Sequence, residues 1–234
     1  MAKKNTDKTQ ENIQVVEEAL SRTEMFLEKN QKLILYIIGG IIILFGGYYG
    51  YEKFIKLPRA REAQEKMFIA EKYFEQDSLN LALNGDGLNL GFLDIIDDYS
   101  RTPSGNLARF YAGSIYLKQG QFDDAIELLK KFKAADPMVG PTALRMLGDA
   151  HLELNDPGKA ADYYLEAAEE ANNEFLTPEF LLRAGNTFEI MKEWEKALDA
   201  YTRIRKDYPT SFRSNSVEKY IARVEGYIQH GTGN

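Results

Sequence analysis

The feature that most constrains the fold of this chain is a pattern that occurs three times after residue 105. The segments 106–137, 141–172 and 178–209 align without gaps, and their starts are 35 and 37 residues apart. Each has a glycine, an aromatic residue or histidine three positions later, and an alanine twelve positions after the glycine. The glycines are Gly113, Gly148 and Gly185, the large residues Tyr116, His151 and Phe188, and the alanines Ala125, Ala160 and Ala197. A supersecondary unit stacked at least three times is therefore predicted.

This skeleton resembles the tetratricopeptide repeat (TPR) family from about residue 62 to the C-terminus. The resemblance implies an all-α domain over 62–234, in which each repeat is a hairpin of two antiparallel helices and the hairpins stack into a solenoid. We expect repeats at 106–139, 141–174 and 178–211, and a capping helix at 214–229. Upstream, Ala70 and Tyr73 repeat the small-then-aromatic relation. Residues 59–103 are therefore expected to be a degenerate first repeat that contains a long inserted loop at 75–89.

An uncharged run of 19 residues, 33–51, precedes this domain. A helix of that length spans roughly 28 Å, close to the thickness of the bilayer's hydrocarbon core. Tyrosines lie near both ends of the run, where aromatic rings favour the membrane interface. A single transmembrane helix is predicted, with a buried core helix as the alternative. Gly39, Gly46 and Gly50 share one face of it, which favours close packing of a second helix.

Two shorter segments flank the expected span. The polar N-terminal segment 1–32 has apolar residues at helical spacing, including Ile13, Val16, Leu20 and Leu27, which predicts an amphipathic helix. Residues 52–61 are expected to be a juxtamembrane linker. More lysines and arginines lie on the C-terminal flank of the span, and this count places the repeat domain in the cytoplasm. The rule is weak for a flank that is a long domain.

Composition excludes several kinds of chemistry. The chain has no cysteine and two histidines, so thiol nucleophiles, cysteine zinc sites and histidine-rich metal sites are not expected. Its formal net charge is -7, which disfavours binding to nucleic acid. The loop sequence from Asn84 to Gly87 has a tight-turn composition but lacks the ligand spacing of a calcium loop. His151 is expected to pack in the core with its ring nitrogens hydrogen-bonded. We therefore predict no catalytic residues, cofactor or metal.

The first helices of TPR hairpins line a groove that holds polypeptide segments, and the resemblance transfers this face to the present chain. The residues implied are Leu107, Phe110, Ser114, Leu117, Arg145, Asp149, Leu152, Leu182, Asn186 and Glu189. This set mixes apolar and polar side chains. It lacks the Lys/Asn/Arg combination with which chaperone-binding TPR domains hold a C-terminal carboxylate, so that kind of ligand is not expected.

The layout of short N-terminal segment, single span and acidic TPR domain is similar to the ancillary subunit of the SecYEG translocon. That similarity implies a single-pass protein of the bacterial inner membrane with a periplasmic repeat domain, opposite to the charge count. It also implies a role in protein translocation or envelope chaperoning, with translocon subunits or other protein segments as partners. The alternative function is a scaffold for envelope or cell-division assembly that self-associates into a homo-oligomer.

Overall fold

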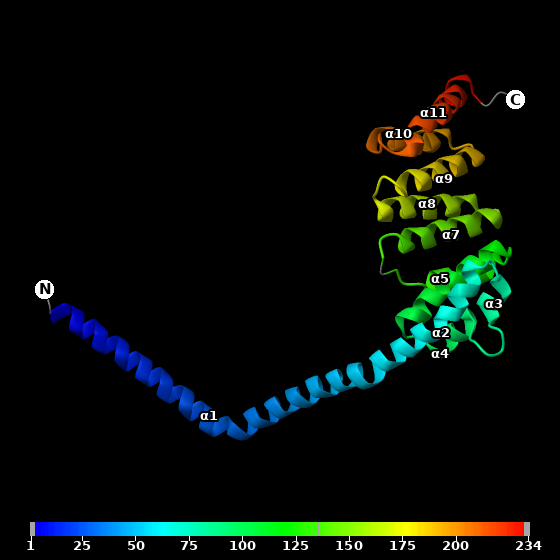
Figure 1. The fold of residues 1–234 in the computed structure, drawn as a ribbon. Coiled ribbons are helices and arrows are strands. Elements are labelled where there is room, and N and C mark those ends of the chain that lie inside the picture. Colours follow the sequence, from blue (N-terminus) through cyan, green and yellow to red (C-terminus); the bar gives the residue numbers. More distant parts are fainter. Residues whose placement is uncertain (1–2, 135, 232–234) are drawn as a thin grey trace. The chain divides into compact units, whose positions relative to one another are not determined.

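The computed structural model describes the backbone of residues 3–134 and 136–231, and side chains from Met25 onward except Glu28 within those ranges. The described residues are predominantly helical and contain no strand. The chain divides into two compact units, Met1–Pro58 and Arg59–Asn234, which are described separately below. Figure 1 shows the order of the helices along the chain.

The first unit is a long helix, α1 (Lys3–Tyr51), followed by one π-helical turn at Glu52–Lys56. The segment Lys29–Glu75 contains a window with mean hydropathy 2.0, which is apolar enough to cross a membrane, and none of that window is buried. Side chains such as Ile43 and Leu44 are about three-quarters exposed. This exposure favours an anchor over the buried core helix. The expected linker at 52–61 is helical, and the proposed stripe of Ile13, Val16 and Leu20 lies outside the described side chains.

The second unit is an array of helical hairpins, as the repeat pattern predicted. Its helices are α2 (Leu57–Glu75), α3 (Leu79–Asn84), α4 (Phe92–Asp98), α5 (Pro103–Lys118), α6 (Phe122–Lys131), α7 (Val139–Glu153), α8 (Pro157–Ala171), α9 (Thr177–Ile190), α10 (Trp194–Asp207) and α11 (Phe212–His230). In Figure 1 the helices from α5 to α11 follow one another in antiparallel pairs. The buried side chains form clusters within and between neighbouring pairs.

The three complete hairpins turn in the same way. The turn of each hairpin has one residue in the left-handed region, namely Gly120, Asn155 and Lys192, with φ of 75°, 59° and 61°. The amide of the following residue then donates to a carbonyl of the first helix, at 2.9 Å in every case. These bonds satisfy carbonyls at the end of the first helix and start the second helix after a short turn. The turns recur at the spacing of the repeat.

The degenerate first repeat differs from expectation in the place of its insertion. Asp77 has φ 55°, and the amide of Ser78 donates to the Tyr73 carbonyl at 2.9 Å, so the usual hairpin turn is present here. Ala82, which is fully buried, lies twelve residues after Ala70, as in the complete repeats. The short helix α3 is therefore the start of the second helix, and 75–89 is not one long loop. The interruption begins only after α3.

The interrupting loop is held by one carboxylate. Asp86 accepts from the amides of Leu88 and Asn89, at 2.8 and 2.6 Å, and from the Tyr73 hydroxyl at 2.7 Å. These hydrogen bonds hold the pKa of Asp86 well below its usual range. Gly85 and Gly87 have φ of 77° and 85°, as the tight-turn interpretation requires.

Candidate peptide-binding groove

In each of the last two complete hairpins, a tyrosine side chain of the second helix extends across to the first helix. Its ring fills the space beside the recurring glycine of the first helix: a Cβ on Gly148 would lie 2.6 Å from Cε1 of Tyr164. The Tyr164 hydroxyl then donates to Oδ1 of Asp149 at 2.7 Å. Tyr164 is 1% exposed, and its burial raises the pKa of its hydroxyl. The glycine thus allows a second-helix side chain to support a polar residue on the face of the first helix.

The next repeat has the same arrangement with different polar partners. The Tyr201 hydroxyl lies 2.6 Å from Oε1 of Glu189 and 2.8 Å from Oδ1 of Asn186, and its single proton is shared between these two acceptors. Arg223 of α11 binds the same Glu189 carboxylate through Nε and Nη2, at 3.0 and 2.6 Å. Burial is the largest cause of the raised pKa of Tyr201. Arg223 of the capping helix α11 therefore holds the Glu189 carboxylate of the last complete repeat in position.

Ion pairs join successive first helices across this face. Asp149 contacts Arg145 on its own helix α7 and binds Arg183 of α9 at 3.0 Å. Arg183 also lies 3.7 Å from Glu179, and Glu179 binds Arg213 of α11 at 2.6 Å. Carboxylates and guanidinium groups alternate along this series, so each of these charges has an oppositely charged neighbour within the protein. We expect this face to select ligands weakly by charge.

A hollow of about 450 Å³ lies where these groups meet. It draws residues from three successive first helices and is within the size range of ligand pockets. Its lining combines apolar side chains with a lysine, carboxylates, a tyrosine hydroxyl and a guanidinium group. The lining residues are Leu117, Lys118, Gly120, Phe122, Asp149, Leu152, Glu153, Tyr164 and Arg183. We call this the central groove.

The structure brings only part of the expected groove set together. Leu117, Asp149 and Leu152 line the central groove, and Arg145 contacts its Asp149. Asn186 and Glu189 meet one repeat further on, at the Tyr201 hydroxyl.

The remaining four expected groove residues lie in packed positions. Leu107 packs against the cluster around Phe92. Phe110 packs against Phe132, with ring centroids 5.5 Å apart. Ser114 and Leu182 are 8% and 6% exposed. Side chains from these positions contribute to the stacking of repeats rather than to the lining of the central groove.

The sequence reasoning missed Tyr164 and Arg183. The ring of Tyr164 is buried, but its hydroxyl reaches Asp149. A signal for it exists in the sequence, because a tyrosine follows the glycine by sixteen residues in both of the last two complete repeats. Arg183 comes from the neighbouring repeat, and no spacing within one repeat indicates it.

Three other predicted features can be located in the described residues. His151 is 7% exposed and stacks on Tyr163, so its packing is confirmed, but among the described residues its buried Nε2 has no hydrogen-bond partner. Within the described residues, no group of three or more His, Asp or Glu side chains is placed to hold a metal ion. Around Gly39, Gly46 and Gly50, no atom lies within 4 Å of an added Cβ, so that face of the helix is open.

Comparison with known proteins agrees with this geometry. Residues 92–138 and 145–212 match the family model described as a tetratricopeptide repeat. These segments are tetratricopeptide repeats. No curated protein matches the sequence significantly. A crystal structure of MamA protein superposes with a TM-score of 0.50 at 18% identity, covering 74% of this chain and 97% of that one. A second MamA crystal structure gives a TM-score of 0.48 at 19% identity, covering 69% and 95%.

The TPR assignment fixes the general role of the second unit. TPR domains are protein-interaction modules and generally do not catalyse reactions. At 18% identity the first MamA structure supports the fold and nothing finer. What the groove binds and where the protein works must therefore be argued from the residues.

Proposed function

We propose that this chain is a membrane-tethered interaction protein that holds an extended polypeptide segment in its central groove. The observation that carries the proposal is the 450 Å³ hollow lined from three successive repeats. A ligand crossing all three repeats must be elongated, and the groove offers it both hydrogen-bonding groups and apolar contacts. The exposed apolar helix at 33–51 supplies the tether.

The ion pairs within the groove limit which kind of polypeptide segment can bind there. Arg145 and Arg183 are already paired with Asp149, so an acidic ligand would have to compete with existing ion pairs. Leu117 and Leu152 offer apolar surface in the same groove. A segment with small apolar side chains and a free backbone fits best. Such segments are abundant in polypeptides that have not yet folded, which supports a role beside protein translocation or envelope chaperoning in a bacterial inner membrane.

Site-specific crosslinking in native membranes tests this proposal. The chain has no cysteine, so a single cysteine at Leu152 can carry a photoactivatable label into the groove. The matched control carries the label at Glu169, an exposed residue of α8 that does not line the groove. We expect translocon subunits or unfolded exported chains to be recovered from position 152 and not from 169. Equal recovery from both positions, or recovery of neither class of partner, would refute the proposal.

The same cysteine at Glu169 reports the side of the membrane. A periplasmic repeat domain predicts labelling by a membrane-impermeant thiol reagent in intact spheroplasts. Protection of Cys at this position until the membrane is opened would instead favour the cytoplasmic side that the flanking charges suggest.

A self-associating scaffold is the second candidate, and a different surface favours it. Phe175 and Phe212 are 89% and 88% exposed, and they flank a pocket of about 560 Å³. Aromatic side chains of this kind are enriched at protein interfaces. If the scaffold function is correct, Phe175→Ser combined with Phe212→Ser will convert an oligomer into monomers in mild detergent. A wild-type chain that is already monomeric would exclude this function.

A further inference from the structure

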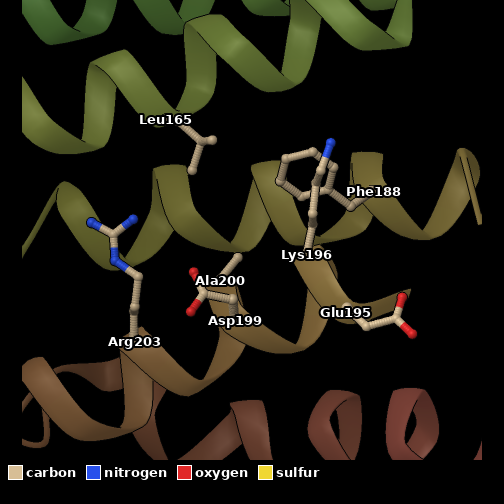
Figure 2. Close-up of a pocket in the computed structure, with 7 residues that line it drawn as sticks. All are labelled: Leu165, Phe188, Glu195, Lys196, Asp199, Ala200 and Arg203. Atoms are coloured by element: carbon tan, nitrogen blue, oxygen red, sulfur yellow. The ribbon is translucent and has the colours of Figure 1, made fainter. Parts of the chain in front are cut away.

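A second pocket lies away from the central groove, between the second helices of two neighbouring repeats. It has a volume of about 320 Å³, and Figure 2 shows its lining. Leu165 of α8, Phe188 of α9 and Ala200 of α10 supply the apolar part. The charged residues Glu195, Lys196, Asp199 and Arg203 all come from α10. We call this the α8–α10 pocket.

The preceding repeat shows what occupies this position when the pocket is filled. Tyr163 stands there at the place of Ala200, and His151 stands at the place of Phe188, both 37 residues earlier. The Tyr163 ring stacks on the His151 ring, with centroids 5.4 Å apart and an interplanar angle of 18°. In the last complete repeat, Ala200 ends at its Cβ. The pocket is therefore the space of a missing aromatic side chain.

A lysine covers the ring of Phe188, which is 6% exposed, so an entering aromatic ring has to displace the lysine side chain. Lys196 lies over Phe188, with its ammonium nitrogen 5.5 Å from the ring centroid, and pairs with Glu193 at 2.7 Å. Lys159 holds the same position in the preceding repeat and pairs with Asp156 at 2.6 Å. A stacked ring and a lysine paired three residues back therefore coexist in this fold.

We propose that the α8–α10 pocket binds an aromatic side chain of a partner polypeptide, stacked over Phe188 as Tyr163 is stacked over His151. Two cationic and two anionic side chains surround the opening, so their charges balance. We therefore expect the pocket to select its ligand by the aromatic ring rather than by net charge. Among the described residues, Asp199 and Arg203 have no ion-pair partner, so a hydroxyl on the ring has an acceptor and a donor at hand. Tyrosine is the side chain that fits best.

This second docking point goes beyond the groove proposal and does not depend on it. The groove takes an extended segment across three repeats, whereas the pocket takes one side chain between α8 and α10. A partner that uses both would be held at two positions, which raises its apparent affinity through effective concentration. Each site is tested by a different readout, so failure of one leaves the other standing.

Nuclear magnetic resonance of the full chain in detergent micelles tests the pocket directly. The probes are two capped pentapeptides in a glycine–serine background, one with a central tyrosine and one with a central leucine. Methyl labelling of alanine and leucine reports on Ala200 and Leu165. We expect the tyrosine peptide to shift both methyl signals at millimolar concentration, and the leucine peptide to shift them at least fivefold less. No shift, or equal shifts with both peptides, would overturn the proposal.

Two reciprocal variants provide the controls. Ala200→Tyr should fill the pocket in the manner of Tyr163, raise the melting temperature and weaken tyrosine-peptide binding at least tenfold. Tyr163→Ala should open an equivalent pocket and produce a new response to the tyrosine peptide in the ring signals of His151. The second variant keeps the test decisive if Ala200→Tyr does not fold. Unchanged binding to Ala200→Tyr, or no new response near His151, would contradict the inference.

Discussion

Replacing the glycine at the centre of the second complete repeat tests how the hairpins are packed. In Gly148→Ala, the new Cβ would lie 2.6, 2.8 and 3.1 Å from three atoms of the Tyr164 ring. Carbon atoms in contact normally lie about 3.5–4.0 Å apart. The ring is 1% exposed and its hydroxyl is bound to Asp149, so it has no free space to enter. Either the two helices separate or the hydroxyl loses its partner.

The two opposing effects can be weighed. Overpacking of a core costs about 1–3 kcal/mol. Alanine in a helix interior gains about 1 kcal/mol over glycine. If Tyr164 is displaced instead, it loses a hydrogen bond to a carboxylate, worth about 1.5–3 kcal/mol. Either cost, less the gain from alanine, leaves a loss of up to about 2 kcal/mol in the free energy of unfolding of Gly148→Ala, even though alanine is the better helix former.

Gly226→Ala is the matched control. Gly226 also lies inside a helix, α11, but an added Cβ there has no atom within 4 Å. The same chemical change should raise the free energy of unfolding by up to about 1 kcal/mol. Urea unfolding of the full chain in detergent, followed by the fluorescence of Trp194, isolates the repeat unit because the chain has one tryptophan. If Gly148→Ala is as stable as Gly226→Ala, the close approach of Tyr164 to Gly148 is wrong.

Three further predictions concern single side chains. Tyr201→Phe removes the hydroxyl that binds Asn186 and Glu189, and we expect the same urea assay to show a loss of about 1 kcal/mol. Asp149→Asn removes the carboxylate that two arginines share and should cost about 1–2 kcal/mol, less at high salt; no dependence on salt would contradict the ion-pair geometry. Burial and nearby lysines lower the pKa of His151, so its neutral form is favoured in the folded state. Stability should be full above pH 6.5, the unfolded value, and should fall as the pH drops through the lower folded pKa. His151→Phe, which introduces the residue found at this position in the next repeat, should reduce this loss of unfolding free energy at acidic pH.

The repeated skeleton was sufficient to predict the hairpins. A glycine, a large residue and an alanine at constant spacing mark the contact between two antiparallel helices, and this contact is local in sequence. For that reason the helix pairs of the three complete repeats and the burial of His151 agree with expectation. Ala82 also obeyed the spacing, yet the polar loop that follows it led to the prediction of a loop where α3 begins the second helix.

The candidate site was only partly predictable. Spacing indicated which residues stand on the first helices, but it could not separate side chains that line a groove from those that pack between repeats. Leu107 and Phe110 pack between helices, whereas Leu117, ten residues after Leu107, lines the central groove. The difference depends on how far each neighbouring repeat covers the helix, which no single repeat encodes.

The sequence by itself determined the long apolar helix, the number of complete hairpins and the glycine positions, because each follows from composition or spacing within a short stretch of chain. Only the tertiary structure decided that Tyr164 reaches Asp149 across its own hairpin, that Arg183 completes the groove from the next repeat, and that Ala200 leaves room for a ring. The contact between Tyr164 and Asp149 joins the two helices of one hairpin. The other two features arise from the stacking of one hairpin on the next, which brings together side chains such as Asp149 and Arg183, 34 residues apart.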